Sequence, residues 1–183
     1  MKYSTLRSQM RPGDLIGFSG KGPFSTLIKA VTVSDISHVG VILQTQIDNT
    51  GKYINQIIES TSLTPEFAGV QINRMSARVR DYEGDIYLYS LTKDSRKKLD
   101  LVEFFQFMLK QNKKPYDTIQ AGLSALDLIP DTKEDLRKLF CSELVTAGYE
   151  VGGLINNINA SEQTPKDVCN FGYYEKRVKI DKG

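Results

Sequence analysis

The sequence of 183 residues has no tryptophan, one histidine and two cysteines. Two cysteines are too few to build a disulfide-linked scaffold, and they do not form the Cys-x2-Cys pattern that is typical of zinc sites. Any chemistry that uses imidazole must come from His38, because the chain has no second histidine. Cys141 and Cys169 therefore each need an explanation of their own.

The sequence also lacks an excess of charge and any long apolar run. Lys and Arg number 24 against 22 acidic residues, a formal charge of +2, so charge gives no reason to expect a nucleic-acid partner. No stretch approaches the roughly 18 apolar residues of a membrane-spanning helix, and the N-terminal residues lack the apolar segment of a secretory signal. We therefore expect no integral membrane segment, a cytoplasmic location and one globular domain over residues 1–183.

Hydrophobic patterns predict strands in the first two-thirds of the chain and helices after them. Apolar runs bounded by turn residues predict strands at 15–19, 39–43, 53–59, 70–72 and 85–91, and the turn at 48–51 predicts a hairpin between the second and third. Apolar residues at helical spacing predict helices at 24–33, from 95 onward, at 118–129 and at about 133–148.

Cys141 is the first candidate for a reactive side chain. It lies in the segment Phe140-Cys141-Ser142-Glu143, at or near the expected first turn of a helix, where the positive end of the helix dipole favours a thiolate. A free cysteine is more often a small buried hydrophobic residue, and this alternative stays open. Cys169 has no such context, so we predict a structural role for it.

His38 and Glu59 are predicted to lie near each other on the hairpin. If Asp48 is opposite Gly51, then Gly40 faces Glu59, and His38 shares that face one diagonal step away. A cysteine, a histidine and a carboxylate can act together, because the base produces the thiolate and the acid fixes the ring of the base. A structural histidine and an exposed Glu59 on an edge strand are the alternatives, since register is weakly fixed by sequence.

Five short motifs follow one another along the chain: Arg11-Pro12-Gly13-Asp14-Leu15-Ile16, Ser37-His38-Val39-Gly40-Val41-Ile42, Ile58-Glu59-Ser60, Pro115-Tyr116-Asp117 and Phe140-Cys141-Ser142-Glu143-Leu144-Val145. Together they resemble the circularly permuted NlpC-type papain-like hydrolases, specifically the YiiX/YaeF-like branch. In that family the histidine strand precedes the cysteine helix, and the same order is found here.

The resemblance implies an α+β, circularly permuted papain-like fold in which an antiparallel sheet packs against helices. It implies that Cys141 is the nucleophile, His38 the base and Glu59 the third polar member, with Tyr116 near the cleft. The implied reaction is hydrolysis of an amide or ester bond through a thioester, on a peptide or an acylated small substrate, with no metal or other cofactor. Two alternatives stay open: a lipid-directed acyltransferase or lipase of the same superfamily, and a binding module that has lost catalysis. The oligomeric state is not predicted.

Overall fold

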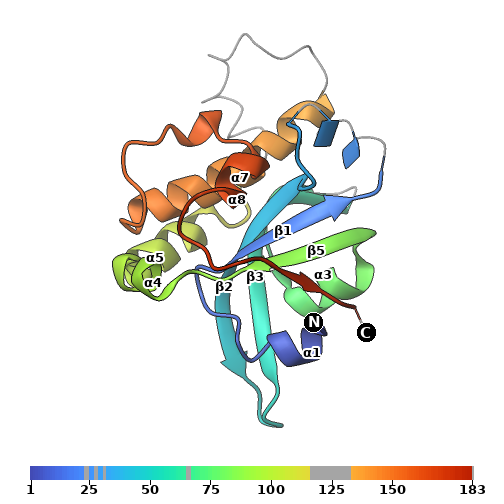
Figure 1. The fold of residues 1–183 in the computed structure, drawn as a ribbon, viewed down its shortest axis with the longest axis vertical. Coiled ribbons are helices and arrows are strands. Elements are labelled where there is room, and N and C mark those ends of the chain that lie inside the picture. Colours follow the sequence, from blue (N-terminus) through green and yellow to red (C-terminus); the bar gives the residue numbers. More distant parts are fainter. Residues whose placement is uncertain (23–24, 27–28, 31, 65–66, 116–132, 183) are drawn as a thin grey trace.

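The computed structural model describes residues 1–22, 25–26, 29–30, 32–64, 67–115 and 133–182. Its centre is a six-stranded sheet in the order β4-β3-β2-β1-β5-β6, and all neighbouring strands are antiparallel (Figure 1). The strands are β1 (Leu15–Gly20), β2 (His38–Ile47), β3 (Tyr53–Thr64), β4 (Phe67–Arg74), β5 (Gly84–Tyr89) and β6 (Val178–Ile180). The helices are α1 (Tyr3–Leu6), α3 (Met75–Asp81), α4 (Lys93–Lys98), α5 (Leu101–Gln111), α7 (Lys133–Val151), the short 3-10 helix η1 (Ala160–Glu162) and α8 (Pro165–Cys169).

Helices cover both faces of the sheet. On one face α7 packs across β2 and β3 and is itself flanked by α5, whereas α1 and α3 lie on the other side (Figure 1). Alternate residues of β2 enter two separate cores: Val41 belongs to the cluster that contains Val145 of α7, and Ile42 belongs to the cluster that contains Val79 of α3. Burial on both faces explains why the strands have continuous apolar runs and no apolar–polar alternation. The expected α+β class, with an antiparallel sheet and helices packed on it, is confirmed.

The expected single helix beginning near Ser95 is wrong, because the chain forms α4 and α5 with a break between them. Asp100 causes the break. Its side chain accepts hydrogen bonds from the amides of Val102 and Glu103, at 2.9 and 3.1 Å, and so caps a new helix. The apolar periodicity runs through this point, and for that reason periodicity alone did not reveal the break.

The predicted helix at 118–129 lies outside the described residues, and so do residues 24, 27–28 and 31 of the helix predicted at 24–33. Within the segments that the structure does describe, no helix is both long and apolar enough to cross a membrane.

Asp14 is a buried carboxylate that ties the start of β1 to distant parts of the chain. Its Oδ1 accepts a hydrogen bond of 2.9 Å from the amide of Leu91, and its Oδ2 accepts one of 2.8 Å from the amide of Arg11. Arg96 of α4 forms an ion pair with the same carboxylate. Asp14 therefore joins the first turn of the chain, the end of β5 and α4.

Replacing Asp14 with alanine is expected to lower the free energy of unfolding by roughly 3–5 kcal/mol, because it leaves buried donors and one cation without their partner. Urea denaturation followed by circular dichroism measures the change. Asp94→Ala is the matched control, since Asp94 contacts only Lys97 at 3.5 Å on the surface, and its midpoint should match that of the unmodified chain. A loss below about 1 kcal/mol for Asp14→Ala would contradict the assigned role.

Candidate active site

His38 is the first residue of β2 and lies at the end of the sheet. Its Nε2 is 2.8 Å from Oε2 of Glu59, and its ring packs against Phe18 with the ring centroids 5.2 Å apart. Ser37 fixes the backbone just before it, because its hydroxyl accepts a hydrogen bond from the amide of Gly20 and donates one to the carbonyl of Phe18. The ring is therefore held in place by a carboxylate, an aromatic face and an anchored strand end.

Glu59 reaches His38 because the hairpin has the predicted register at this point. Val41 is paired with Ile58, so the next pair places Gly40 opposite Glu59. A side chain at Gly40 would collide with Glu59, since an added Cβ would lie 2.9 Å from the Glu59 Cβ. The absence of a side chain at Gly40 thus leaves the room that Glu59 occupies.

Glu59 is fully buried and is held by two further side chains. The Nδ2 of Asn73 donates to Oε1 at 3.1 Å, and Nη2 of Arg78 donates to Oε2 at 3.1 Å. The Nε of Arg78 also lies 2.6 Å from Oε1. Burial alone would raise the pKa of Glu59, but the hydrogen bond from His38 and the charge of Arg78 outweigh it and lower the pKa below its ordinary value. Glu59 is therefore ionised at neutral pH.

Cys141 of α7 is buried, and its side chain interacts with the ring of His38. Burial alone would lower the pKa of His38, but charge interaction and hydrogen bonding with Cys141, together with those of Glu59, raise it to about 9. Since Nε2 of the ring is engaged by Glu59, Nδ1 is the nitrogen left for the sulfur. The structure therefore brings Cys141, His38 and Glu59 into one chain of contacts.

The expected position of Cys141 in the first turn of its helix is wrong. Helix α7 begins at Lys133, so Cys141 lies eight residues further along. At that depth the backbone amides bond to carbonyls of the preceding turn, and the helix dipole acts only within the first turn. The interaction with His38, and not the helix terminus, is what distinguishes Cys141 chemically, and backbone amides at the helix start cannot serve a carbonyl oxygen there.

Tyr116, the expected residue beside the cleft, lies outside the described residues. Cys169 ends α8 and packs against the core cluster that contains Cys141. Neither cysteine forms a disulfide bond, and burial raises the pKa of the Cys169 thiol to about 12. Cys169 therefore stays protonated at neutral pH.

Solved structures include chains that are similar to this one. No family model matches the chain, and neither does any curated protein. The chain is similar to the crystal structure of metalloprotein yiiX from Escherichia coli O157:H7, DUF1105. The TM-score is 0.49 and the identity 20%, and the match covers 79% of this chain and 67% of that chain.

Arg78 is the site residue that the sequence did not point to. Helix α3 buries Met75, Arg78 and Val79, whose spacing of three and four residues places them on one helix face. The guanidinium carbon of Arg78 lies 4.9 Å from the ring centroid of Phe18 and 5.4 Å from that of Tyr82. An arginine on the apolar face of a short helix was the available signal, because a buried guanidinium requires a buried acid.

The side chains at the site do not fit a metal ion. Across the described residues, no group of three or more His, Cys, Asp or Glu side chains is arranged to hold one. Both carboxylate oxygens of Glu59 already face Arg78, whose positive charge opposes the binding of a dication. The same arrangement suits a histidine that exchanges a proton with a thiol.

Proposed function

We propose that this chain is a cysteine hydrolase of the permuted papain-like type, in which Cys141 is the nucleophile, His38 the base and Glu59 the residue that orients His38. The observation that carries the proposal is that one imidazole contacts a buried carboxylate through Nε2 and also a buried thiol. Such a series of contacts is the arrangement that activates a cysteine for attack on a carbonyl.

The balance of buried charges supports an ion pair between Cys141 and His38. With a pKa of about 9, His38 carries a proton at neutral pH. The negative charge of Glu59 is already matched by Arg78, which contacts both of its oxygens. An unmatched imidazolium would be costly in this buried site, so the thiolate of Cys141 is the anion that balances it.

The reaction then follows from this resting state. The thiolate attacks the carbonyl carbon of an amide or ester, and the carbonyl electron pair moves to its oxygen. The imidazolium of His38 donates its proton to the departing amine or alcohol as the carbon–nitrogen or carbon–oxygen bond breaks, which leaves a thioester on Cys141. Neutral His38 next takes a proton from water, the hydroxide attacks the thioester, and the acid product leaves as the ion pair is restored.

The experiment that tests the proposal compares the alkylation rates of Cys141 and Cys169 by iodoacetamide, measured by peptide mass spectrometry. Cys141 should be labelled rapidly at about pH 6, where an ordinary thiol is almost wholly protonated, because His38 maintains the thiolate. Cys169 should be labelled slowly, since burial raises its pKa to about 12. His38→Ala should remove the advantage of Cys141, and Cys169→Ala is the matched control that should leave it unchanged.

Equal, slow labelling of both cysteines that does not depend on His38 would overturn the proposal and favour a binding module. If Cys141 is reactive, a panel of amide and ester substrates distinguishes an amide hydrolase from the lipid-directed acyltransferase or lipase. Release of an amine would favour the first, and release of a fatty acid the second.

A further inference from the structure

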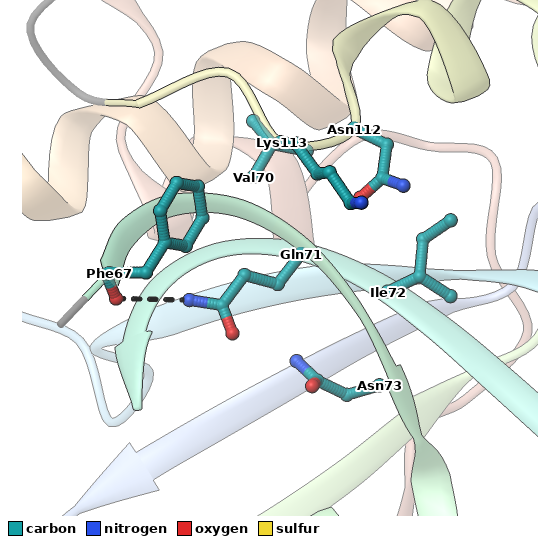
Figure 2. A pocket seen from close by; sticks show the side chains of 7 residues that line it. All are labelled: Phe67, Val70, Gln71, Ile72, Asn73, Asn112 and Lys113. Carbon is teal, nitrogen blue, oxygen red and sulfur yellow. Dashed lines mark hydrogen bonds between the residues drawn. The ribbon is translucent and has the colours of Figure 1, made fainter. Parts of the chain in front are cut away.

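A pocket of about 410 Å³ lies at the edge of the sheet that β4 forms (Figure 2). Strand β4 is the edge strand and supplies most of the wall, and the chain just after α5 supplies the rest. The side chains that line the pocket are Phe67, Val70, Gln71, Ile72, Asn73, Asn112 and Lys113. Figure 2 shows Val70 and Lys113 on one side of the β4 ribbon and Asn73 on the other.

One side chain of the lining contacts a proposed catalytic residue, and another belongs to the core cluster that contains Cys141. On one side Val70 belongs to the core cluster that contains Cys141. On the other side Asn73 donates a hydrogen bond of 3.1 Å to Oε1 of Glu59. A molecule in the pocket would therefore lie one side chain away from the carboxylate that orients His38.

The first half of the β4 edge already forms backbone hydrogen bonds with the chain that follows α5. The amide of Val70 donates to the carbonyl of Lys114 at 2.9 Å, and the amide of Lys113 donates to the carbonyl of Val70 at 2.8 Å. Because backbone groups of alternate residues point the same way, the amide and carbonyl of Ile72 face the same edge. In the described part of the chain, no backbone group beyond the sheet bonds to Ile72.

The chemistry of the lining favours a polypeptide as the occupant. Three apolar side chains are interspersed with the amides of Gln71, Asn73 and Asn112, and the backbone donor and acceptor of Ile72 open toward the edge. An extended peptide satisfies backbone groups of this kind by strand addition, and the backbone of Val70 on the same edge is already satisfied by Lys113 and Lys114. An acyl chain would cover the backbone amide and carbonyl of Ile72 and offer them no hydrogen bond, which is unfavourable.

We propose that this pocket is a substrate subsite which takes an extended peptide segment, paired as an added strand with the backbone of Ile72. The proposal rests on the hydrolase function above and narrows its substrate class to peptides. The apolar walls receive side chains of the segment, and the backbone of β4 aligns it.

The test uses three thiol reagents with the same iodoacetyl group: iodoacetamide, an iodoacetyl tetra-alanine amide, and iodoacetyl octylamide. The tetra-alanine reagent should label Cys141 at least about tenfold faster than iodoacetamide, since two backbone hydrogen bonds supply roughly that factor. The octyl reagent should gain no such advantage. Ile72→Pro should remove the peptide advantage, because proline lacks the amide that faces the edge. The rate of Ile72→Pro with iodoacetamide is the control, since it shows whether Cys141 is still reactive in that variant.

A second measurement does not depend on whether Ile72→Pro folds. A tetra-alanine reagent with every peptide nitrogen methylated should label the unmodified chain no faster than iodoacetamide does, because it cannot donate to β4. Two outcomes would show that the subsite is wrong while the hydrolase proposal stands, provided that Cys141 reacts rapidly with iodoacetamide. In one, the peptide and methylated reagents label Cys141 at equal rates; in the other, the octyl reagent labels it fastest. If Cys141 reacts as an ordinary thiol with all reagents, the hydrolase proposal itself fails.

Discussion

Cys141→Ala is expected to abolish hydrolysis, and His38→Ala to lower kcat/KM by roughly 1,000-fold or more, because the nucleophile and its proton carrier act as one unit. The double variant should be no worse than Cys141→Ala. The assay measures the rate of amine release from peptide substrates. Thermal unfolding of each variant shows whether it is still folded. After His38→Ala, Glu59 still has Arg78 and Asn73 as partners, so the fold should persist.

The pH profile of the same assay gives an independent check. His38 has a pKa of about 9, so its ring is protonated below that pH and neutral above it. Rising pH therefore removes the proton that the leaving group needs, and kcat/KM should fall as the pH passes through about 9. A rate that continues to rise well above this pH would contradict the assignment of His38 as the acid. Measurable turnover by Cys141→Ala would exclude the mechanism altogether.

The pairing of His38 with Glu59 could be predicted from sequence, although the turn that led to it was not read correctly. The turn holds one residue more than expected, because the amide of Asp48 donates to the carbonyl of Lys52 and not to that of Gly51. A bulge between Ile42 and Gln44 then shifts the register back by one. The two differences cancel, and Glu59 arrives opposite Gly40 as predicted.

The charge partner of Glu59 could not be predicted in the same way. Strand pairing is fixed by alternation and turn position, which are local properties of the sequence. The contact with Arg78 depends on how α3 packs on the sheet after β4 ends, and nineteen residues separate the two side chains. The depth of Cys141 in α7 was missed for a related reason, since the segment around it has helical character on both sides. The sequence therefore predicted most strands and the contact between His38 and Glu59, but not the ion pair between Glu59 and Arg78.

Arg78→Met is expected to lower the free energy of unfolding by roughly 3–5 kcal/mol, because it removes the cation from a buried carboxylate and leaves a similar apolar volume. Glu59→Gln in the same chain should recover most of that loss, since it removes the uncompensated charge. Denaturant unfolding of the two single variants and the double variant gives the coupling energy directly. If Arg78→Met lowers the free energy of unfolding and the added Glu59→Gln does not restore it, Arg78 acts only by packing between Phe18 and Tyr82.

Arg78→Met also tests the chemistry of the site, because it changes the charge near the thiolate of Cys141. This effect is measured by alkylation, independently of the free energy of unfolding. Without Arg78, the imidazolium of His38 is balanced by Glu59 alone, and a thiolate at Cys141 would leave the site with a net negative charge. Alkylation of Cys141 in Arg78→Met should therefore need a more alkaline solution than alkylation in the unmodified chain. Arg78→Lys keeps the charge and is the matched control, so its labelling profile should stay close to the original. An unchanged profile for Arg78→Met would mean that Arg78 does not set the charge balance of the Cys141–His38 pair.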